Sequence, residues 1–233
     1  MSHNHIDEQQ SLLMAELKRK GASLVGFGDV SVARLEFTEK YPVAISLAVK
    51  YSDTIIDNLH ADDEAFRLHI EDMHRQLEAL YDVAESLLSS WQYECVRIPH
   101  SIIADTLPQM ISDFPVKIAA TCANLGWIGK CGLLVTKEYG PRLELGAILT
   151  DAKFKTAIAA TKSKCGKCCL CAKACPAKAI KGTNWKRGVD RCELLDVFQC
   201  NKKRKEGIPV IGRKYPCGLC IQACPIGRKR SNL

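Results

Sequence analysis

The last third of this sequence is rich in cysteine, and its longest cysteine motif is KCGKCCLCAKACP at residues 164–176. Four cysteines of this motif follow the spacing C-x2-C-x2-C-x3-C-P, namely Cys165, Cys168, Cys171 and Cys175. The segment CGLCIQACP repeats the last three steps of the spacing with Cys217, Cys220 and Cys224. In two-cluster ferredoxins the cysteine before the proline ligates the neighbouring cluster. The pattern therefore predicts two [4Fe–4S] clusters with crossed ligation.

This rule divides the cysteines between the two clusters. One cluster is expected to bind Cys165, Cys168, Cys171 and Cys224. The other is expected to bind Cys175, Cys217 and Cys220, and it needs one more ligand. Cys192 and Cys200 are both candidates for that position, and Cys192 is favoured. Cys169, which lies between two ligands in the sequence, is predicted to be a structural thiol.

Other uses of cysteine fit the sequence less well. The chain has 13 cysteines, and its first residues, MSHNHIDEQQ, lack the basic and apolar segments of a secretory signal. Disulfides are rare in the cytosol, so metal or redox chemistry is the expected use. A zinc ribbon also uses paired C-x2-C motifs but does not need the x3-C-P ending that occurs twice here. Because no apolar run reaches the roughly 18 residues of a membrane helix, a cytoplasmic protein is expected.

Charge and cysteine content both change near residue 150. Residues 151–233 hold 20 Lys and Arg against 5 Asp and Glu, whereas the rest of the chain holds 13 against 21. Two domains are therefore predicted, over residues 1–155 and 156–233. The basic excess is expected to balance the net negative charge of the clusters and to offer a surface to an acidic partner. An RNA contact is an open alternative.

The segments before the cysteines must position whatever the clusters serve. Apolar residues at helical spacing predict helices over residues 9–20, 62–92 and 115–124. Apolar and β-branched runs predict strands over 23–30, 41–51, 93–101, 133–136 and 143–150. The last two are expected to form a hairpin that turns at Gly140 and Pro141. Gly26-Phe27-Gly28 lacks the third glycine of a dinucleotide-binding fingerprint and is interpreted as a strand end and turn. The order of elements predicts an α+β layered domain.

The block NLGWIGKCGLLVT, followed by LELGAILTD and CGKCCLCAKACP, resembles the epoxyqueuosine reductase family. That family is related to the corrinoid-containing reductive dehalogenases. Arg191-Cys192 and IPVIGRKYPCGLCIQACP follow the family's order, so the resemblance is strong over residues 122–225. It implies a nitroreductase-like layered α/β domain that binds cobalamin, followed by a bacterial-type two-cluster ferredoxin-like domain. The family's ligand order matches the seven motif cysteines and supports Cys192 as the eighth ligand.

The resemblance also suggests a cobalamin site and a proton donor. It assigns to the cobalamin site the loop Leu125, Gly126, Trp127, Ile128 and Gly129. The two glycines would let the backbone approach a flat macrocycle, and the tryptophan would offer a ring face and one N–H donor. A strand-entry turn with a buried tryptophan is the alternative. The implied chemistry is reductive: cluster electrons reduce cobalt, and a protein acid protonates the substrate.

Asp105 is the candidate acid, because Asp105-Thr106-Leu107-Pro108 resembles the family's catalytic aspartate stretch. Several extra residues separate it from the Gly-Trp-Ile-Gly loop, and a helix N-cap is the alternative role. Asp113 and His100 are further candidates.

The substrate is less constrained by the sequence. Family members that act on tRNA commonly continue into a helical-repeat extension after the second cluster, and this sequence ends eight residues after Pro225. The tRNA substrate of those family members therefore does not carry over safely to this protein. A small molecule or a modified nucleoside is an alternative substrate. A ferredoxin- or flavodoxin-type donor of low-potential electrons is the expected partner. Two other functions stay open: an electron carrier without an organic cofactor, and a flavin-dependent reductase that uses FMN.

Overall fold

The computed structural model describes residues 3–33, 35–59, 63–99, 113–207 and 217–228. These residues form two compact units whose segments alternate along the chain. The first unit comprises residues 1–49, 73–125 and 144–160, and the second comprises 50–72, 126–143 and 161–233. The second unit thus includes two segments that the sequence pattern assigned to the first domain. Within the described ranges, no helix is long and apolar enough to cross a membrane.

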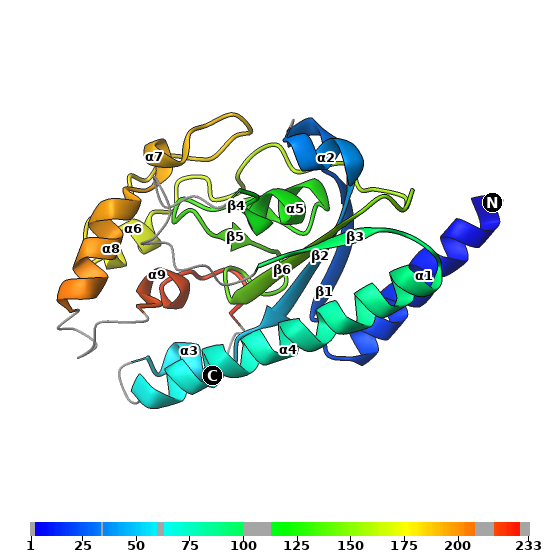
Figure 1. The fold of residues 1–233 in the computed structure, drawn as a ribbon. Helices are drawn as coiled ribbons and strands as arrows, with labels where there is room; N and C mark the ends of the chain where they lie inside the picture. The colour runs from blue at the N-terminus through cyan, green and yellow to red at the C-terminus, as the bar shows by residue number, and fades with distance from the viewer. Residues whose placement is uncertain (1–2, 34, 60–62, 100–112, 208–216, 229–233) are drawn as a thin grey trace. The chain divides into compact units, whose positions relative to one another are not determined.

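The first unit is built on a four-stranded sheet with the order β1-β2-β6-β3 (Figure 1). Its strands are β1 (Leu24–Asp29), β2 (Val43–Lys50), β3 (Cys95–Ile98) and β6 (Leu143–Thr150). The pairs β1–β2 and β3–β6 are both antiparallel. The helical elements are α1 (His3–Arg19), η1 (Ser31–Ala33), α2 (Glu36–Lys40), α4 (Asp63–Ser90) and α5 (Val116–Cys122). The predicted helices and the predicted strands of this sheet are therefore confirmed, with boundaries shifted by a few residues.

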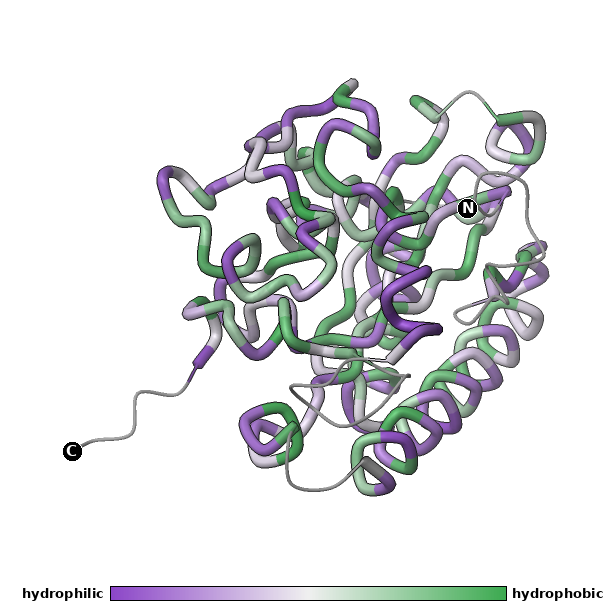
Figure 2. Tube along the Cα trace, turned by 90° about the vertical axis from the view of Figure 1, so that its left-hand side faces the viewer, coloured by the Kyte–Doolittle hydropathy of each residue, from purple (hydrophilic) through white to green (hydrophobic). Residues whose placement is uncertain are grey.

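Different helices cover the two faces of the sheet. On β6, a Cβ at Gly146 would lie 2.7 Å from the Tyr81 hydroxyl of α4, so this position faces α4. Ala147 is the next residue along β6 and therefore points to the opposite face, where it belongs to a core cluster with Cys122 of α5. Figure 2 shows hydrophobic and hydrophilic residues alternating along α4, as expected for a helix with one buried stripe. The fold is a mixed α+β fold, as predicted.

Tyr81 joins α4 to two strands through its buried hydroxyl. The hydroxyl donates to the carbonyl of Ile98 at 2.7 Å and accepts from the N–H of Ala147 at 3.2 Å. Tyr81→Phe should lower the free energy of unfolding by about 1–3 kcal/mol, because both buried backbone groups lose a partner. Tyr41→Phe is the control, since its hydroxyl bonds Glu94 at the surface and its loss should cost less than about 0.5 kcal/mol. Equal shifts in denaturant midpoint for the two variants would contradict this role.

The segment Gly26-Phe27-Gly28 differs from its interpretation as a strand end and turn. β1 runs straight through it, with Gly26 opposite Ser46 and Gly28 opposite Ala44 of β2. A Cβ at Gly28 would lie 2.4 Å from the backbone nitrogen of Ala123, just after α5. The glycines are therefore needed where a helix end packs closely on the strand, and not for a turn.

The predicted hairpin between residues 133–136 and 143–150 is also wrong. β5 (Leu134–Val135) pairs with β4 (Trp127–Ile128), in a separate two-stranded sheet of the second unit. The strand over 143–150 is β6, which pairs with β3 of the main sheet. The predicted loop around Trp127 is therefore a short strand, and this pairing holds the segment after it in place.

The second unit is composed mainly of short helices and loops. Its helices are α3 (Asp53–Asp57), α6 (Leu170–Ala174), α7 (Arg191–Leu194), α8 (Val197–Glu206) and α9 (Leu219–Gln222). Arg142 is fully buried, and its guanidinium donates to Asp53 at 3.0 Å and to Asp57 at 2.6 Å. The side chain of Gln222 donates to the carbonyl of Asp57 at 3.1 Å. Helix α3 thus ties the end of the 126–143 segment to α9, and both carry residues of the site described next.

Candidate metal centre

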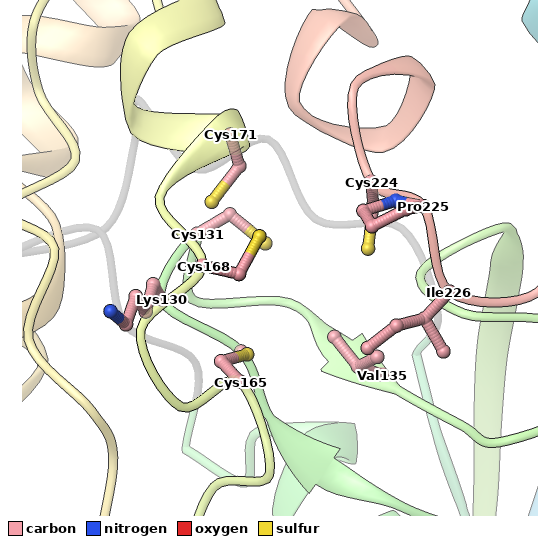
Figure 3. Close-up of a pocket in the computed structure, with 10 residues that line it drawn as sticks. Lys130, Cys131, Val135, Cys165, Cys168, Cys171, Cys224, Pro225 and Ile226 are labelled. Atoms are coloured by element: carbon pink, nitrogen blue, oxygen red, sulfur yellow. The ribbon is translucent and has the colours of Figure 1, made fainter.

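Five cysteines of the second unit line one pocket. The cavity of about 90 Å³ is lined by Cys165, Cys168, Cys171 and Cys224, together with Cys131 and the apolar side chains of Val135, Pro225 and Ile226. Figure 3 shows that the first three come from the chain at α6 and the fourth from the chain just after α9. The set of four is the one that crossed ligation predicted for one cluster. A water molecule needs only about 10–15 Å³ of such space, so the cavity has room for a larger group.

The thiols of this pocket influence one another. Burial is the main cause that raises the pKa of Cys224, and the nearby thiols of Cys165, Cys171 and Cys168 raise it further. The pKa of Cys171 is also raised, mainly by a hydrogen bond with Cys131 and then by burial. Gathering ionisable thiols in this way is unfavourable for the thiolate form unless a cation offsets the charge. A bound metal does so, because it takes thiolates as ligands. The donor set therefore fits an iron–sulfur cluster.

Two glycines allow the chain after Cys224 to cross the turn that follows β5. Gly140 has a φ of +56°, and a Cβ there would lie 1.9 Å from the carbonyl oxygen of Ile226. Gly227 has a φ of +78°, and a Cβ there would lie 2.0 Å from the carbonyl carbon of Tyr139. Backbone thus meets backbone on both sides of the crossing, with no flexible side chain to move aside. This contact fixes the position of Cys224, two residues before Ile226.

Gly140→Ala should therefore weaken the metal centre. The added methyl group must displace Ile226 and with it Cys224, so iron content per chain should fall and the free energy of unfolding should drop by more than the roughly 1–2 kcal/mol of a left-handed alanine. Gly188→Ala is the matched control, because Gly188 also has a positive φ, +88°, but a Cβ there meets nothing within 4 Å. Iron analysis and thermal unfolding of both variants test this. Normal iron content in Gly140→Ala would show that the crossing does not position Cys224.

A second group of thiols lies around α8. Burial is the main cause that raises the pKa of Cys200, and the neighbouring Cys175 and Cys217 raise it further, while Arg204 lowers it. Cys200 is half-buried in α8, whereas the predicted ligand Cys192 is exposed in α7. Cys175 and Cys217 thus act electrostatically on Cys200, which keeps Cys200 a candidate ligand of the other cluster beside Cys192. Among the described residues, no group of three or more His, Cys, Asp or Glu side chains is arranged to hold one metal ion.

Cys131 is a residue of the site that sequence reasoning missed. It lines the pocket and is 5% exposed. The thiols of Cys171 and Cys220 are the main influences on its pKa. The bond with Cys171 lowers the pKa of Cys131, but the bond with Cys220 and burial outweigh it and raise the pKa to about 12. The only signal in the sequence is its place two residues after the Gly-Trp-Ile-Gly loop.

Cys169, the predicted structural thiol, has a cationic neighbour. The buried ammonium of Lys130 lies 3.4 Å from the Cys169 sulfur. A Cβ at Gly182 would lie 3.8 Å from the same sulfur, in ordinary van der Waals contact. The thiol is therefore packed beside the pocket and does not line it.

The glycines of the predicted cobalamin loop accommodate the protein's own chain. A Cβ at Gly126 would lie 2.2 Å from the carbonyl oxygen of Val135, and one at Gly129 would lie 2.7 Å from a Val135 methyl group. Close approach by β5 therefore explains both glycines without a macrocycle. Leu125, the first residue of the loop, is half-buried at the end of the 73–125 segment of the first unit. Ile128, in β4, is 8% exposed.

Trp127 keeps one feature that suits a ligand. Its side chain is 6% exposed, and the Lys164 ammonium lies 5.5 Å from the ring centroid. Its indole Nε1 is buried and has no hydrogen-bond partner in the part of the chain that the structure describes. An unpaired buried donor is costly, so an acceptor from a ligand or water would be favoured there.

Of the three candidate proton donors, Asp113 alone lies within the described residues. Asp105 and His100 lie outside the described residues. Asp113 is exposed, and the N-cap of α5 is Pro115, so Asp113 does not cap that helix.

Sequence comparison finds epoxyqueuosine reductases among the curated relatives of the chain. No model of a known protein family matches the chain. The chain is 35% identical over 103 residues to an epoxyqueuosine reductase of Synechococcus sp. (strain RCC307). This stretch covers 44% of the chain and 31% of that enzyme, so the chain spans less than a third of the relative in this match.

Comparison with solved structures extends the likeness to most of the chain. The epoxyqueuosine reductase of Bacillus subtilis matches with a TM-score of 0.63 at 18% identity, over 95% of this chain and 66% of that one. A catabolic reductive dehalogenase matches with a TM-score of 0.66 at 19% identity, over 90% of this chain and 30% of that one. At these identities the matches show a shared α+β fold.

Proposed function

We propose that this chain, an epoxyqueuosine reductase-like protein structurally related to the reductive dehalogenases, is a reductase that carries two [4Fe–4S] clusters. The observation that carries the proposal is the pocket in which Cys224 joins Cys165, Cys168 and Cys171 from a distant part of the sequence. Four thiols around a cavity suit a cube that is ligated at its corners.

The ligands divide into two sets. The first cluster is held by Cys165, Cys168, Cys171 and Cys224, and the second by Cys175, Cys200, Cys217 and Cys220. Cys200 is proposed in place of the predicted Cys192, supported by the influence of Cys175 and Cys217 on its pKa. Each cluster, when bound, accepts and releases one electron at a time. Around the first cluster, Val135, Pro225 and Ile226 limit the access of water, which affects its reduction potential.

Cobalamin is the proposed second cofactor, in a nitroreductase-like domain followed by the ferredoxin-like one. Support comes from a related dehalogenase structure that was interpreted as suggesting a mechanism for B12-dependent dehalogenation. When bound, cobalamin supplies the reduced cobalt for substrate reduction. In this chain, the free indole N–H of Trp127 suits an acceptor on that cofactor. Asp105 is proposed to protonate the substrate, because the sequence around it resembles the family's catalytic aspartate stretch.

A modified nucleoside is the proposed substrate class. One solved epoxyqueuosine reductase is bound to an epoxyqueuosine-modified tRNA stem loop. The high content of Lys and Arg in residues 151–233 would favour both an RNA phosphate backbone and an acidic electron donor of the ferredoxin or flavodoxin type. Steep loss of RNA affinity with added salt would support the RNA contact, and binding that is unaffected by salt would argue against it.

The proposal is tested by purifying the full chain without oxygen and measuring iron, sulfide, zinc and the absorption spectrum. About eight iron and eight sulfide per chain would support two clusters. Zinc in place of iron and sulfide would overturn the proposal. A flavin spectrum would favour a flavin-dependent reductase. Clusters that are present while added cobalamin does not bind would favour an electron carrier.

A separate variant tests the proposed contact between Trp127 and cobalamin. Trp127→Phe keeps an apolar ring and removes the N–H donor, so it should weaken cobalamin binding about five- to thirtyfold, as expected for a lost hydrogen bond of about 1–2 kcal/mol. Trp91→Phe, in the first unit and outside the proposed site, is the control and should bind cobalamin like the unaltered chain. Fluorescence or absorption titration measures both. Equal cobalamin affinities in the two variants would show that the Trp127 N–H does not bind cobalamin.

A further inference from the structure

Helix α8 (Val197–Glu206) has an exposed side that carries an aromatic ring and two ammonium groups. Phe198 is 61% exposed and is the only aromatic residue among the exposed large hydrophobic side chains of the described ranges. Lys202 and Lys205 follow it after four and seven positions, and both are exposed. Residues at these intervals lie on one side of a helix, so the three form a continuous stripe that we call the α8 surface.

Helix stability explains only part of the α8 surface. Positive charge in the last turn favours a helix through its dipole, which suits Lys205. Lys202 lies 3.9 Å from Glu206, but both side chains are more than half exposed, so this ion pair contributes little. Neither effect accounts for a phenylalanine left mostly in water. Aromatic residues are enriched in protein interfaces, and charges around them steer a partner of opposite sign.

The other side of α8 carries Cys200, the proposed ligand of the second cluster. It lies two positions after Phe198 and two before Lys202, and two residues turn a helix by about 200°. A helix with its side chains is about 10–12 Å across, so a partner on the α8 surface would be about one helix diameter from a cluster bound at Cys200. Electron tunnelling falls steeply with distance, and this short separation favours it.

Backbone hydrogen bonds hold α8 beside the first cysteine motif. The N–H of Asp196, the N-cap of α8, donates to the carbonyl of Ala179 at 2.9 Å. The N–H of Lys181 donates to the carbonyl of Leu194 at 2.9 Å. Ala179 lies four residues after Cys175, another proposed ligand of the second cluster. The helix is therefore tied to this ligand segment independently of its own cysteine.

We propose that the α8 surface is the docking site of a small acidic electron-transfer protein that reduces the second cluster. The inference rests on the proposed function and adds the place at which its electron donor binds. In each transfer the donor loses one electron and the cluster gains one, and no bond forms or breaks. Residues 197–206 hold four Lys and Arg against one Glu, so complementary charge favours an acidic partner. A protein is favoured over RNA because the same helix carries a proposed cluster ligand.

The probe is a flavodoxin with a strongly negative net charge, titrated without oxygen against the full cluster-containing chain. Phe198→Ser removes the ring, and Lys202→Glu combined with Lys205→Glu reverses the charge. Each change should weaken flavodoxin binding about tenfold at low salt. At high salt the loss should shrink for the charge variant, because salt screens exposed charges, and should persist for Phe198→Ser. Cluster reduction by reduced flavodoxin should slow in step, whereas reduction by a small photoreduced deazaflavin should not change.

Matched controls lie at α1 of the first unit. Leu12→Ser corresponds to the serine change, because Leu12 is 49% exposed. Lys18→Glu combined with Lys20→Glu alters the net charge by the same amount at two exposed positions. Both controls should bind flavodoxin within about twofold of the unaltered chain. Lys202→Gln combined with Lys205→Gln removes charge without new repulsion inside α8, so its smaller loss of affinity would show that the effect is not damage to the helix.

Three results would overturn the proposal. Unchanged flavodoxin affinity in Phe198→Ser would show that the ring is not an anchor. An equal loss in the α1 charge control would show that net charge acts without a docking site. Weaker binding of an RNA stem loop with unchanged flavodoxin binding would assign the surface to RNA. None of these results affects the proposed function, which fails separately if the unaltered chain contains no iron and sulfide.

Discussion

Cys224→Ala is expected to remove the same cluster that Cys168→Ala removes. The two residues lie far apart in the sequence but line one pocket. Losing either leaves the first cluster with three thiolates, so iron should fall from about eight to about four per chain, or the cluster should become a three-iron form. Electron transfer to the substrate site should be lost with it. Iron analysis and electron paramagnetic resonance of the two variants should therefore give matching results.

The control for crossed ligation is Cys220→Ala. Cys220 lies in the same short motif as Cys224 but is assigned to the second cluster, so this variant should lose the other resonance signal. If Cys224→Ala instead matched Cys220→Ala, each motif would hold its own cluster. That outcome would falsify crossed ligation while leaving the presence of iron–sulfur clusters intact.

Cys200→Ser is expected to impair the second cluster strongly, and Cys192→Ser is expected to leave it intact. The pKa of Cys200 responds to Cys175 and Cys217, and its side chain is more buried than that of Cys192. Serine is nearly the same size as cysteine but is a much poorer ligand for iron–sulfur clusters, so packing changes little while ligation is lost. The iron of the Cys200 variant should fall towards about four per chain. The Cys192 variant should keep about eight.

The two cysteines thus serve as matched controls for each other, since both precede the second motif and either could reach it by sequence alone. Full iron content in Cys200→Ser together with loss in Cys192→Ser would restore the order that the family resemblance implied. Loss of iron in both variants would mean that one of the two cysteines supports the site without being an iron ligand. Unfolding measurements on the two proteins would then show which one is structural.

Features that depend on local spacing could be predicted from the amino-acid sequence alone. The interval between Cys165, Cys168 and Cys171 was enough to place them on one short segment, because three thiols separated by two residues cannot spread far apart. The repeat of apolar residues along α4 likewise required a buried stripe, since a helix returns to the same face every three or four residues. The buried strand β2 followed from its run of apolar, β-branched residues.

Apart from the placing of Cys224 beside the first motif, contacts with distant segments became clear only from the tertiary structure. Trp127 and Val135 lie opposite each other because β5 pairs with β4, and not with the 143–150 strand as the expected hairpin had it. Cys131 and Cys200 carried no spacing signal, and only packing brings them to the other thiols. The physical reason is that spacing limits where a residue can lie relative to its neighbours, whereas contacts between distant segments depend on which surfaces become buried together.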